Sequence, residues 1–166
     1  MKFSATLDTF SKMLTVACLL LFGSFLYMGF TATGLWTMRI VLFFIFGVPF
    51  LVTYALSARF YTLDDINVSI VRPIGSILIP IRSIKGVSVI SNNIMGHSLK
   101  RRLASGGVFG YFGKFWCREF GNMSWYATRR DQYVMIETVA DKKIVLTPDD
   151  LDFVDLLKNS IESRQR

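Results

Sequence analysis

The hydrophobic pattern divides the chain into one long apolar segment and a mixed segment that follows it. Residues 13–58 are almost wholly apolar, and Arg39 is the one charged residue among them. A helix needs about 20 apolar residues to cross the hydrocarbon core of a bilayer. The pattern therefore predicts a two-helix transmembrane hairpin over residues 13–58, with helices at about 13–32 and 40–57.

Beyond residue 58 the apolar runs become short and alternate with polar residues. In the segment 66–71, Ile66, Val68 and Ile70 fall on one face, which is typical of a half-buried strand. The loops between such runs are too short for parallel crossovers, so the strands are expected to be antiparallel. Seven strands are predicted, at 60–63, 66–71, 76–81, 84–90, 122–128, 133–138 and 144–146.

The last part of the chain has helical spacing. Apolar residues recur along one face from residue 153 to residue 161, which predicts an amphipathic helix. Its start is expected just before this stretch, with Thr147 as N-cap, Pro148 in the first turn and Asp149 at the positive end of the helix dipole.

Together these elements predict an all-β antiparallel sandwich, or partly open barrel, of about seven strands with a C-terminal amphipathic helix. The two-helix transmembrane hairpin precedes it. The expected organisation is an N-terminal segment (1–12), the hairpin (13–58), the sandwich domain (59–163) and a short tail (164–166).

Charge gives the hairpin an orientation. The formal net charge of the chain is +7. Lys2 and Lys12 precede the hairpin and Arg59 and Arg72 follow it, whereas Arg39 alone stands at the turn between the helices. Because cytoplasmic loops of membrane proteins are enriched in Lys and Arg, both termini and the domain are predicted to be cytoplasmic.

A basic stretch within the domain is the main candidate for binding. Between residues 97 and 130 the only acid is Glu119. Bases held close to a membrane can bind anionic lipid headgroups, although scattered bases can also serve as ordinary solvated surface. The candidate lipid-binding residues are Lys100, Arg101, Arg102, Lys114, Arg118, Arg129 and Arg130.

Glycines and aromatic residues alternate inside this stretch. The segment 106–113 lacks the Gly-Lys-Ser/Thr ending of a P-loop. Its Gly-x-x-Gly spacing matches the RNA-clamping loop of KH domains. Packing is the favoured interpretation, because glycines in strands mark bulges or close backbone approach while aromatic residues fill a core. The structural glycines are Gly106, Gly107, Gly110 and Gly113.

The composition does not favour an enzyme. His97 is the one histidine, and Cys18 and Cys117 are too far apart in the chain to suggest a disulfide. No His/Cys cluster has the spacing of a metal site, and no nucleophile, base and orienting group can be named together. We therefore expect no catalytic residues, no metal and no cofactor.

Several segments in order resemble one family. They are the segments 61–65, 79–84, 106–113, 126–128 and 144–150. With these segments the chain resembles bacterial PH-domain proteins of the short, membrane-tethered kind. The resemblance implies a PH-like fold, a bent antiparallel sandwich closed by a C-terminal helix, in a bacterial inner or plasma membrane protein. It supplies no catalytic residues.

Two functions are compatible with this pattern. The first is a membrane-anchored PH-like binding module that contacts anionic lipids through the basic stretch. The second is a protein-docking or self-assembling subunit of a membrane complex, since PH-like sheets can accept partner segments on an edge. Nucleic-acid binding is not favoured, because the aromatic residues are expected in the core instead of on a stacking platform.

Overall fold

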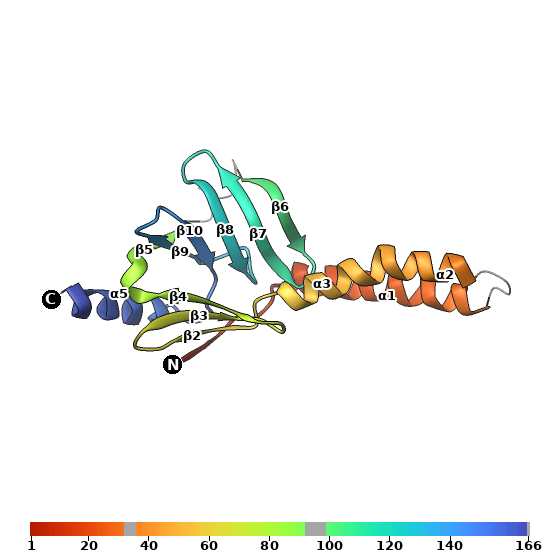
Figure 1. Cartoon of the computed structure of the whole chain (residues 1–166), viewed down its shortest axis with the longest axis horizontal. Helices are drawn as coiled ribbons and strands as arrows, with labels where there is room; N and C mark the ends of the chain where they lie inside the picture. Colours follow the sequence, from red (N-terminus) through yellow and green to blue (C-terminus); the bar gives the residue numbers. More distant parts are fainter. Residues whose placement is uncertain (32–35, 92–98, 166) are drawn as a thin grey trace.

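The computed structural model describes residues 1–31, 36–91 and 99–165. A helical hairpin projects from one end of a β-rich domain, and the C-terminus lies at the opposite end of the molecule (Figure 1). The first arm of the hairpin is α1 (Thr9–Thr31). The second arm is α2 (Trp36–Leu42), the π-helical turn η1 (Phe43–Gly47) and α3 (Val48–Leu56).

The two arms of the helical hairpin pack through aromatic rings. Phe25 stacks on Phe46 with 5.5 Å between ring centroids, and Phe22 stacks on Phe50 at 6.4 Å. The π-helical turn precedes Pro49, which has no N–H to donate and whose ring crowds the preceding turn. Widening the helix there accommodates the proline without breaking the arm.

Both arms are long and apolar enough to cross a membrane, over Thr9–Gly29 and Arg39–Leu56. Only 11% of the first stretch and 6% of the second are buried within the structure. The helices therefore present their apolar side chains outward, unlike helices that fill a soluble core.

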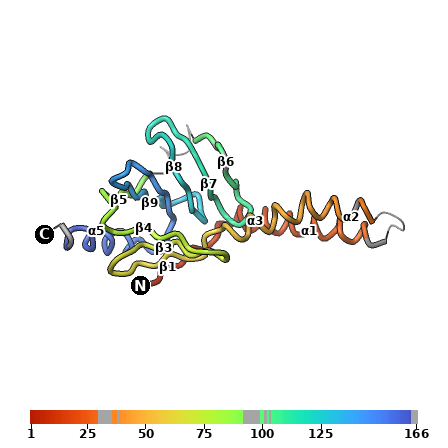
Figure 2. Tube along the Cα trace, in the orientation of Figure 1, coloured from red at the N-terminus to blue at the C-terminus, as the bar shows by residue number. Residues whose placement is uncertain are grey.

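The first sheet joins the two sides of the helical hairpin. It is antiparallel in the order β1-β2-β3-β4. Its first strand comes before α1 and its second strand after α3, so the sheet closes around the hairpin's base; Figure 2 shows the N-terminal strand running along this sheet before the chain enters α1. The strands are β1 (Lys2–Ser4), β2 (Phe60–Leu63), β3 (Asn67–Val71) and β4 (Ser76–Pro80).

The second sheet has the order β5-β9-β10-β8-β7-β6. A short 3-10 turn, η2 (Ile81–Ser83), leads into it. Neighbouring strands are antiparallel except β8 and β10, which run parallel. The strands are β5 (Ile84–Ile90), β6 (Lys100–Gly107), β7 (Gly110–Cys117), β8 (Gly121–Ala127), β9 (Tyr133–Thr138) and β10 (Lys143–Leu146).

The core lies in two clusters. One is formed by both sheets together with the helix α5 (Asp152–Gln165), which buries Phe153 and Leu157. The other lies within the second sheet and includes Trp125 and Phe115, whose rings are 4.6 Å apart. The predicted antiparallel sandwich with a C-terminal helix, preceded by two apolar helices, is confirmed.

Three details differ from the sequence-based expectation. The strands β1, β6 and β7 were not among the seven predicted, and β10 pairs with β8 in parallel. The predicted helix start is wrong, because α5 begins at Asp152: Thr147 is buried within the domain and is not the N-cap, and Pro148 and Asp149 lie before the first turn. His97 and Arg166 lie outside the described residues.

Candidate functional site

The turn between β6 and β7 reaches the helical hairpin and joins it to the domain. We call Val108 and Phe109 the β6–β7 tip. The Phe109 ring lies 4.9 Å from Phe50 and 5.2 Å from Tyr54, both on α3. Its backbone N–H donates to Thr15 Oγ1 on α1 at 3.0 Å. The tip therefore contacts both arms of the hairpin at once.

The conformation of Phe109 shows that these contacts are strong enough to hold it. Its φ is 56°, in the left-handed region that costs a side-chain-bearing residue roughly 1–2 kcal/mol. Contacts of the ring and the amide offset this cost.

Two glycines beside the tip permit close approach. At Gly107, with φ of +133°, an added Cβ would lie 3.0 Å from Leu14 Cδ2 and 3.2 Å from Phe10 Cε1, both on α1. At Gly110, with φ of +110°, it would lie 2.9 Å from the carbonyl oxygen of Ala127. The glycine-aromatic segment thus forms a hairpin whose end seats against the first helix.

The N-terminal residues 1–8 form a second connection, which we call the strap. Besides the β1–β2 pairing, Ser4 O accepts a hydrogen bond from the Asp149 N–H at 3.0 Å, and the Asp8 N–H donates to Thr128 O at 3.2 Å. Thr6 donates to the Asp149 carboxylate through its N–H at 3.1 Å and its hydroxyl at 2.9 Å. The strap therefore spans both sheets before the chain enters α1.

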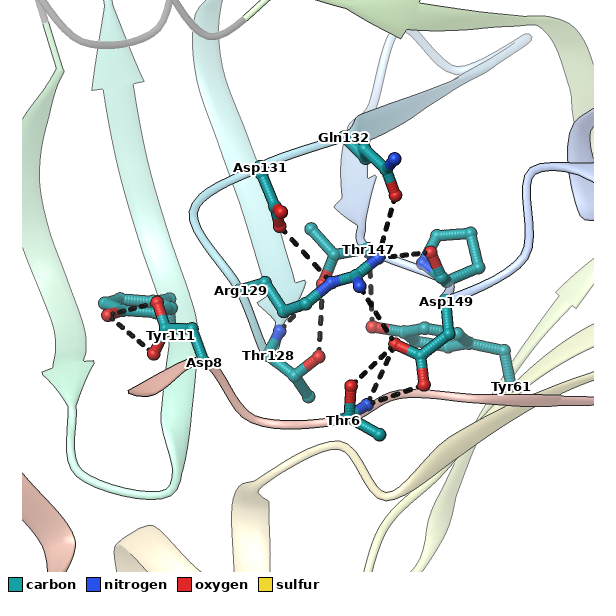
Figure 3. Close-up of polar contacts among 11 residues, drawn as sticks. Thr6, Asp8, Tyr61, Tyr111, Thr128, Arg129, Asp131, Gln132, Thr147 and Asp149 are labelled. Atoms are coloured by element: carbon teal, nitrogen blue, oxygen red, sulfur yellow. Dashed lines mark hydrogen bonds and ion pairs between the residues drawn. The ribbon is translucent and has the colours of Figure 1, made fainter. Parts of the chain in front are cut away.

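Asp149 and Arg129 form the centre of this connection (Figure 3). Arg129 Nη1 lies 3.3 Å from Asp149 Oδ1, and Arg129 Nη2 donates to the Pro148 carbonyl at 2.9 Å. Arg129 also pairs with Asp131 at 3.3 Å and reaches Gln132 Oε1 at 3.1 Å. Its side chain is 17% exposed. Both terminal nitrogens of Arg129 are therefore engaged within the protein, whereas its buried Nε has the ion pair with Asp131 and no hydrogen bond.

A buried hydroxyl network lies beneath this pair. Tyr61 Oη donates to the Tyr126 carbonyl at 2.5 Å and accepts from the Thr147 N–H at 3.3 Å. Thr147 Oγ1 in turn accepts from the Thr128 N–H at 2.8 Å. Burial raises the pKa of Tyr61 to about 12. The phenol is thus a neutral structural link between β2 and the segment after β10.

The start of α1 has its own polar cap. Asp8 Oδ1 accepts from the Ser11 N–H at 2.7 Å, and Tyr111 Oη donates to Asp8 Oδ2 at 3.0 Å. Burial also raises the pKa of Tyr111. The Arg130 guanidinium lies over the rings of Phe10 and Tyr111, at 4.6 and 4.7 Å from their centroids.

The predicted basic residues are divided between the two ends of the second sheet. Arg129 and Arg130 follow β8 at the end that meets the hairpin. Lys100 and Arg102 lie at the start of β6 and are exposed, and Arg118 is exposed in the turn between β7 and β8, where Cys117 pairs with Gly121. The sheet register thus separates two groups of bases.

Three of these exposed bases also make side-chain contacts within the sheet. Lys114 Nζ donates to Ser124 Oγ at 2.8 Å in the middle of the sheet. Lys100 Nζ lies 5.8 Å from the centroid of the Trp116 ring, and Arg102 Nη1 donates to Asn122 Oδ1 at 3.2 Å. The Arg101 backbone belongs to β6, and its side chain lies outside the described part of the structure.

Residues for metal or nucleophilic chemistry do not assemble in the described parts of the chain. Within residues 1–31, 36–91 and 99–165 no group of three or more His, Cys, Asp or Glu could hold a metal ion. Cys117 is buried in the second sheet, and Cys18 is half-buried on α1.

The comparisons with known proteins identify the sandwich. A family model described as Bacterial PH domain matches residues 59–164. No curated protein and no solved structure matched the chain. The matched residues run from the end of α3 into α5, so the strap and the helical hairpin lie outside the match.

Proposed function

We propose a function for this chain from the premise that it belongs to the bacterial PH domain family. PH domains are generally non-catalytic binding modules. The proposed role is a membrane-anchored binding module of the bacterial inner membrane. Its helical hairpin spans the bilayer, and its domain lies with both termini on the cytoplasmic face, because the bases flanking the helices favour that side.

The observation that carries this proposal is the double attachment of the domain to the hairpin. The β6–β7 tip contacts both arms, and the strap pairs with β2 on the far side of the hairpin. A domain attached at both places cannot move away from the bilayer as one on a flexible linker does. Any ligand it binds is therefore one found at the membrane surface.

The proposed ligand is the anionic lipid surface. β6 is an edge strand of its sheet that runs towards the hairpin (Figure 1). It begins, at the end away from the hairpin, with the exposed bases Lys100 and Arg102. Each base near an anionic surface contributes up to about 1 kcal/mol, and salt weakens the attraction.

The test uses the full chain in nanodiscs, since a fragment starting at residue 59 would lack the strap. Hydrogen exchange of β6 is compared in phosphatidylcholine and phosphatidylglycerol discs, at low and high salt. We expect slower exchange in the anionic discs at low salt only. The double variant Lys100→Glu/Arg102→Glu should abolish the difference, whereas Lys158→Glu on α5, away from the hairpin, should retain it.

Protein docking is the second candidate, and the open sheet edges favour it. β4 and β6 each end a sheet, so their outer edges are unpaired among the described strands. An extended segment of another protein, or of a second copy, can add to such an edge. If β6 exchanges equally in both kinds of disc, and crosslinking in the native membrane captures a partner at β4 or β6, docking replaces lipid contact as the function.

A further inference from the structure

A cleft opens where α3 meets the first sheet. It has a volume of about 930 Å³. Leu51 and Tyr54 of α3 line one wall, and Ile74 in the β3–β4 turn lines another. The cleft also contains Arg59 and Arg72, two of the bases that flank the hairpin in the sequence.

Backbone contacts fix the two arginines in this position. The Ile74 N–H donates to the Ala55 carbonyl at 3.3 Å, which holds the β3–β4 turn against the end of α3. Phe60 pairs with Val71 at the end of the β2–β3 ladder, so Arg59 and Arg72 flank one pair of adjoining strand residues. The backbone at both arginines is therefore placed by the fold.

The charge in the cleft is uncompensated within the described protein. None of the described residues that line it is an acid. Arg72 Nε is buried and has no hydrogen-bond partner among the described residues. Arg59 donates from Nη2 to the Tyr54 hydroxyl at 2.6 Å, and its guanidinium carbon lies 5.0 Å from the centroid of the Tyr54 ring, so its partner in the cleft is an aromatic side chain and not an acid. Two cations gathered in this way are stabilised by an anion between them.

The cleft lies at the level where a lipid headgroup would be. Arg59 follows the apolar stretch Arg39–Leu56 by three positions. Leu51, one turn before Tyr54, is exposed and continues the cleft along the apolar surface of α3. The cleft thus joins a cationic part to an apolar part in the order of a phospholipid's headgroup and chain.

We infer that this cleft binds the phosphate group of a membrane phospholipid through Arg59 and Arg72, with an acyl chain along Leu51. Guanidinium groups bind phosphate oxygens in pairs of parallel hydrogen bonds. The inference rests on the proposed membrane anchoring and names a site separate from the basic end of β6.

Native mass spectrometry of the full chain in mild detergent tests the site. The lipids are phosphatidylglycerol and a diacylglycerol with the same chains and no phosphate; glycerol 3-phosphate supplies the phosphate without chains. We expect retained phosphatidylglycerol and little retention of the other two. In the Arg59→Gln/Arg72→Gln variant retention should fall about tenfold, as expected when two charge-assisted contacts are lost.

Two matched variants separate this inference from the proposed function. Lys100→Gln/Arg102→Gln removes the same charge at β6, where the proposed contact is with the surface of a bilayer. Detergent removes that surface, so retention of a single bound phosphatidylglycerol should stay at the wild-type level. Arg72→Gln alone removes a side chain that has no hydrogen-bond partner in the described structure, so its effect on binding is free of a lost internal contact. It should reduce retention severalfold.

Each other outcome overturns the inference in a distinct way. If retention of phosphatidylglycerol falls only in the Lys100→Gln/Arg102→Gln variant, the proposed lipid contact at β6 is supported and the cleft is not the binding site. Equal retention of diacylglycerol would show apolar contact without phosphate recognition. Equal affinity for glycerol 3-phosphate would make the ligand a soluble phosphate instead of a lipid. Wild-type retention of phosphatidylglycerol in the Arg59→Gln/Arg72→Gln variant would remove the cleft, and the nanodisc experiment would still decide the assignment at β6.

Discussion

The two ends of the second sheet use the same residue types for different purposes. At the end nearest the hairpin, Arg129 is paired with Asp149 and Asp131, and Arg130 lies over two aromatic rings. At the opposite end, Lys100 and Arg118 are exposed. The near end is built to hold the helices and the domain together, and the far end leaves its charges available.

This difference teaches that a count of bases is not a description of a binding surface. Arg118 and Arg129 are eleven positions apart and on opposite ends of β8. Arg118 has no hydrogen bond or ion pair within the described protein, whereas Arg129 makes four such contacts. Stability should therefore depend on the near end, and surface chemistry on the far end.

The largest effect is expected at Asp149. Asp149→Ala removes the acceptor of the Thr6 N–H and hydroxyl, and it leaves the partly buried Arg129 with the exposed Asp131 as its remaining carboxylate partner among the described residues. We expect the free energy of unfolding to fall by about 3 kcal/mol. Thermal unfolding of the full chain in detergent, followed by tryptophan fluorescence, measures it. Asp131→Ala is the control, because Asp131 is 54% exposed and should cost less than about 1 kcal/mol. An equal loss in both variants would contradict the central role of Asp149.

The β6–β7 tip should have the next largest effect. Phe109→Ala removes the ring that contacts Phe50 and Tyr54, and should cost about 2 kcal/mol, less than truncating a fully buried Phe. Hydrogen exchange at the tip and at the start of α1 should become faster. Phe120→Ala, in the turn at the opposite end of the sheet, should leave exchange at the tip unchanged. Unchanged exchange in Phe109→Ala would show that the tip does not hold the hairpin.

The buried hydroxyl network should make the stability of the protein depend on pH in the alkaline range. Burial raises the pKa of Tyr61 to about 12, above the ordinary value of 10.0, so folding favours the neutral phenol. Stability is complete below pH 10 and should fall from there towards pH 12, because the unfolded chain loses the proton first. One such group gives a slope of up to about 1.4 kcal/mol per pH unit.

Urea unfolding between pH 8 and pH 12 measures this slope. Tyr61→Phe should be less stable at pH 8, since it loses the bonds to Tyr126 and Thr147, and should show a shallower decline above pH 10. Some decline should remain, because burial also raises the pKa of Tyr133 to about 12. An unaltered slope in Tyr61→Phe would show that this phenol is not what titrates.

The smallest effect on stability should come from the far end. Lys100→Gln and Arg118→Gln should each change the free energy of unfolding by less than about 0.5 kcal/mol, as is usual for exposed positions. The measurement is the same thermal unfolding experiment. A loss of more than about 1 kcal/mol in either variant would mean that the far end is also structural, and the contrast between the ends would not hold.

Local patterns in the sequence were enough to predict much of the fold. Alternation identified β3, where Val68 and Ile70 are buried as expected, although Ile66 lies before the strand and is exposed and Ser69 is buried on the other face. Helical spacing identified α5. β6 and β7 were missed because glycines carry no side chain to mark a face. A weaker signal was present in β7, where Tyr111, Phe115 and Cys117 lie on one buried face. They are four and two positions apart, as expected for residues on the same face of a strand.

The connections around the hairpin could not be predicted in this way. β1 is three residues long, and its partner β2 is separated from it by the whole hairpin. The Thr147-Pro148-Asp149 segment matches a local helix start, but Thr128 and Thr6 compete for its side chains from other parts of the fold. The charges of the basic residues could be read from the sequence, whereas their separation into two groups follows from the register of β7 and β8.

The order of the first sheet also sets the order of assembly. Ribosomes make β1 and α1 first, yet β1 has no partner until β2 has been made, after both helical arms. Asp149, which holds the strap, is made later still. The first strand synthesised is thus among the last to be locked in place, and the domain can close only after the entire hairpin exists.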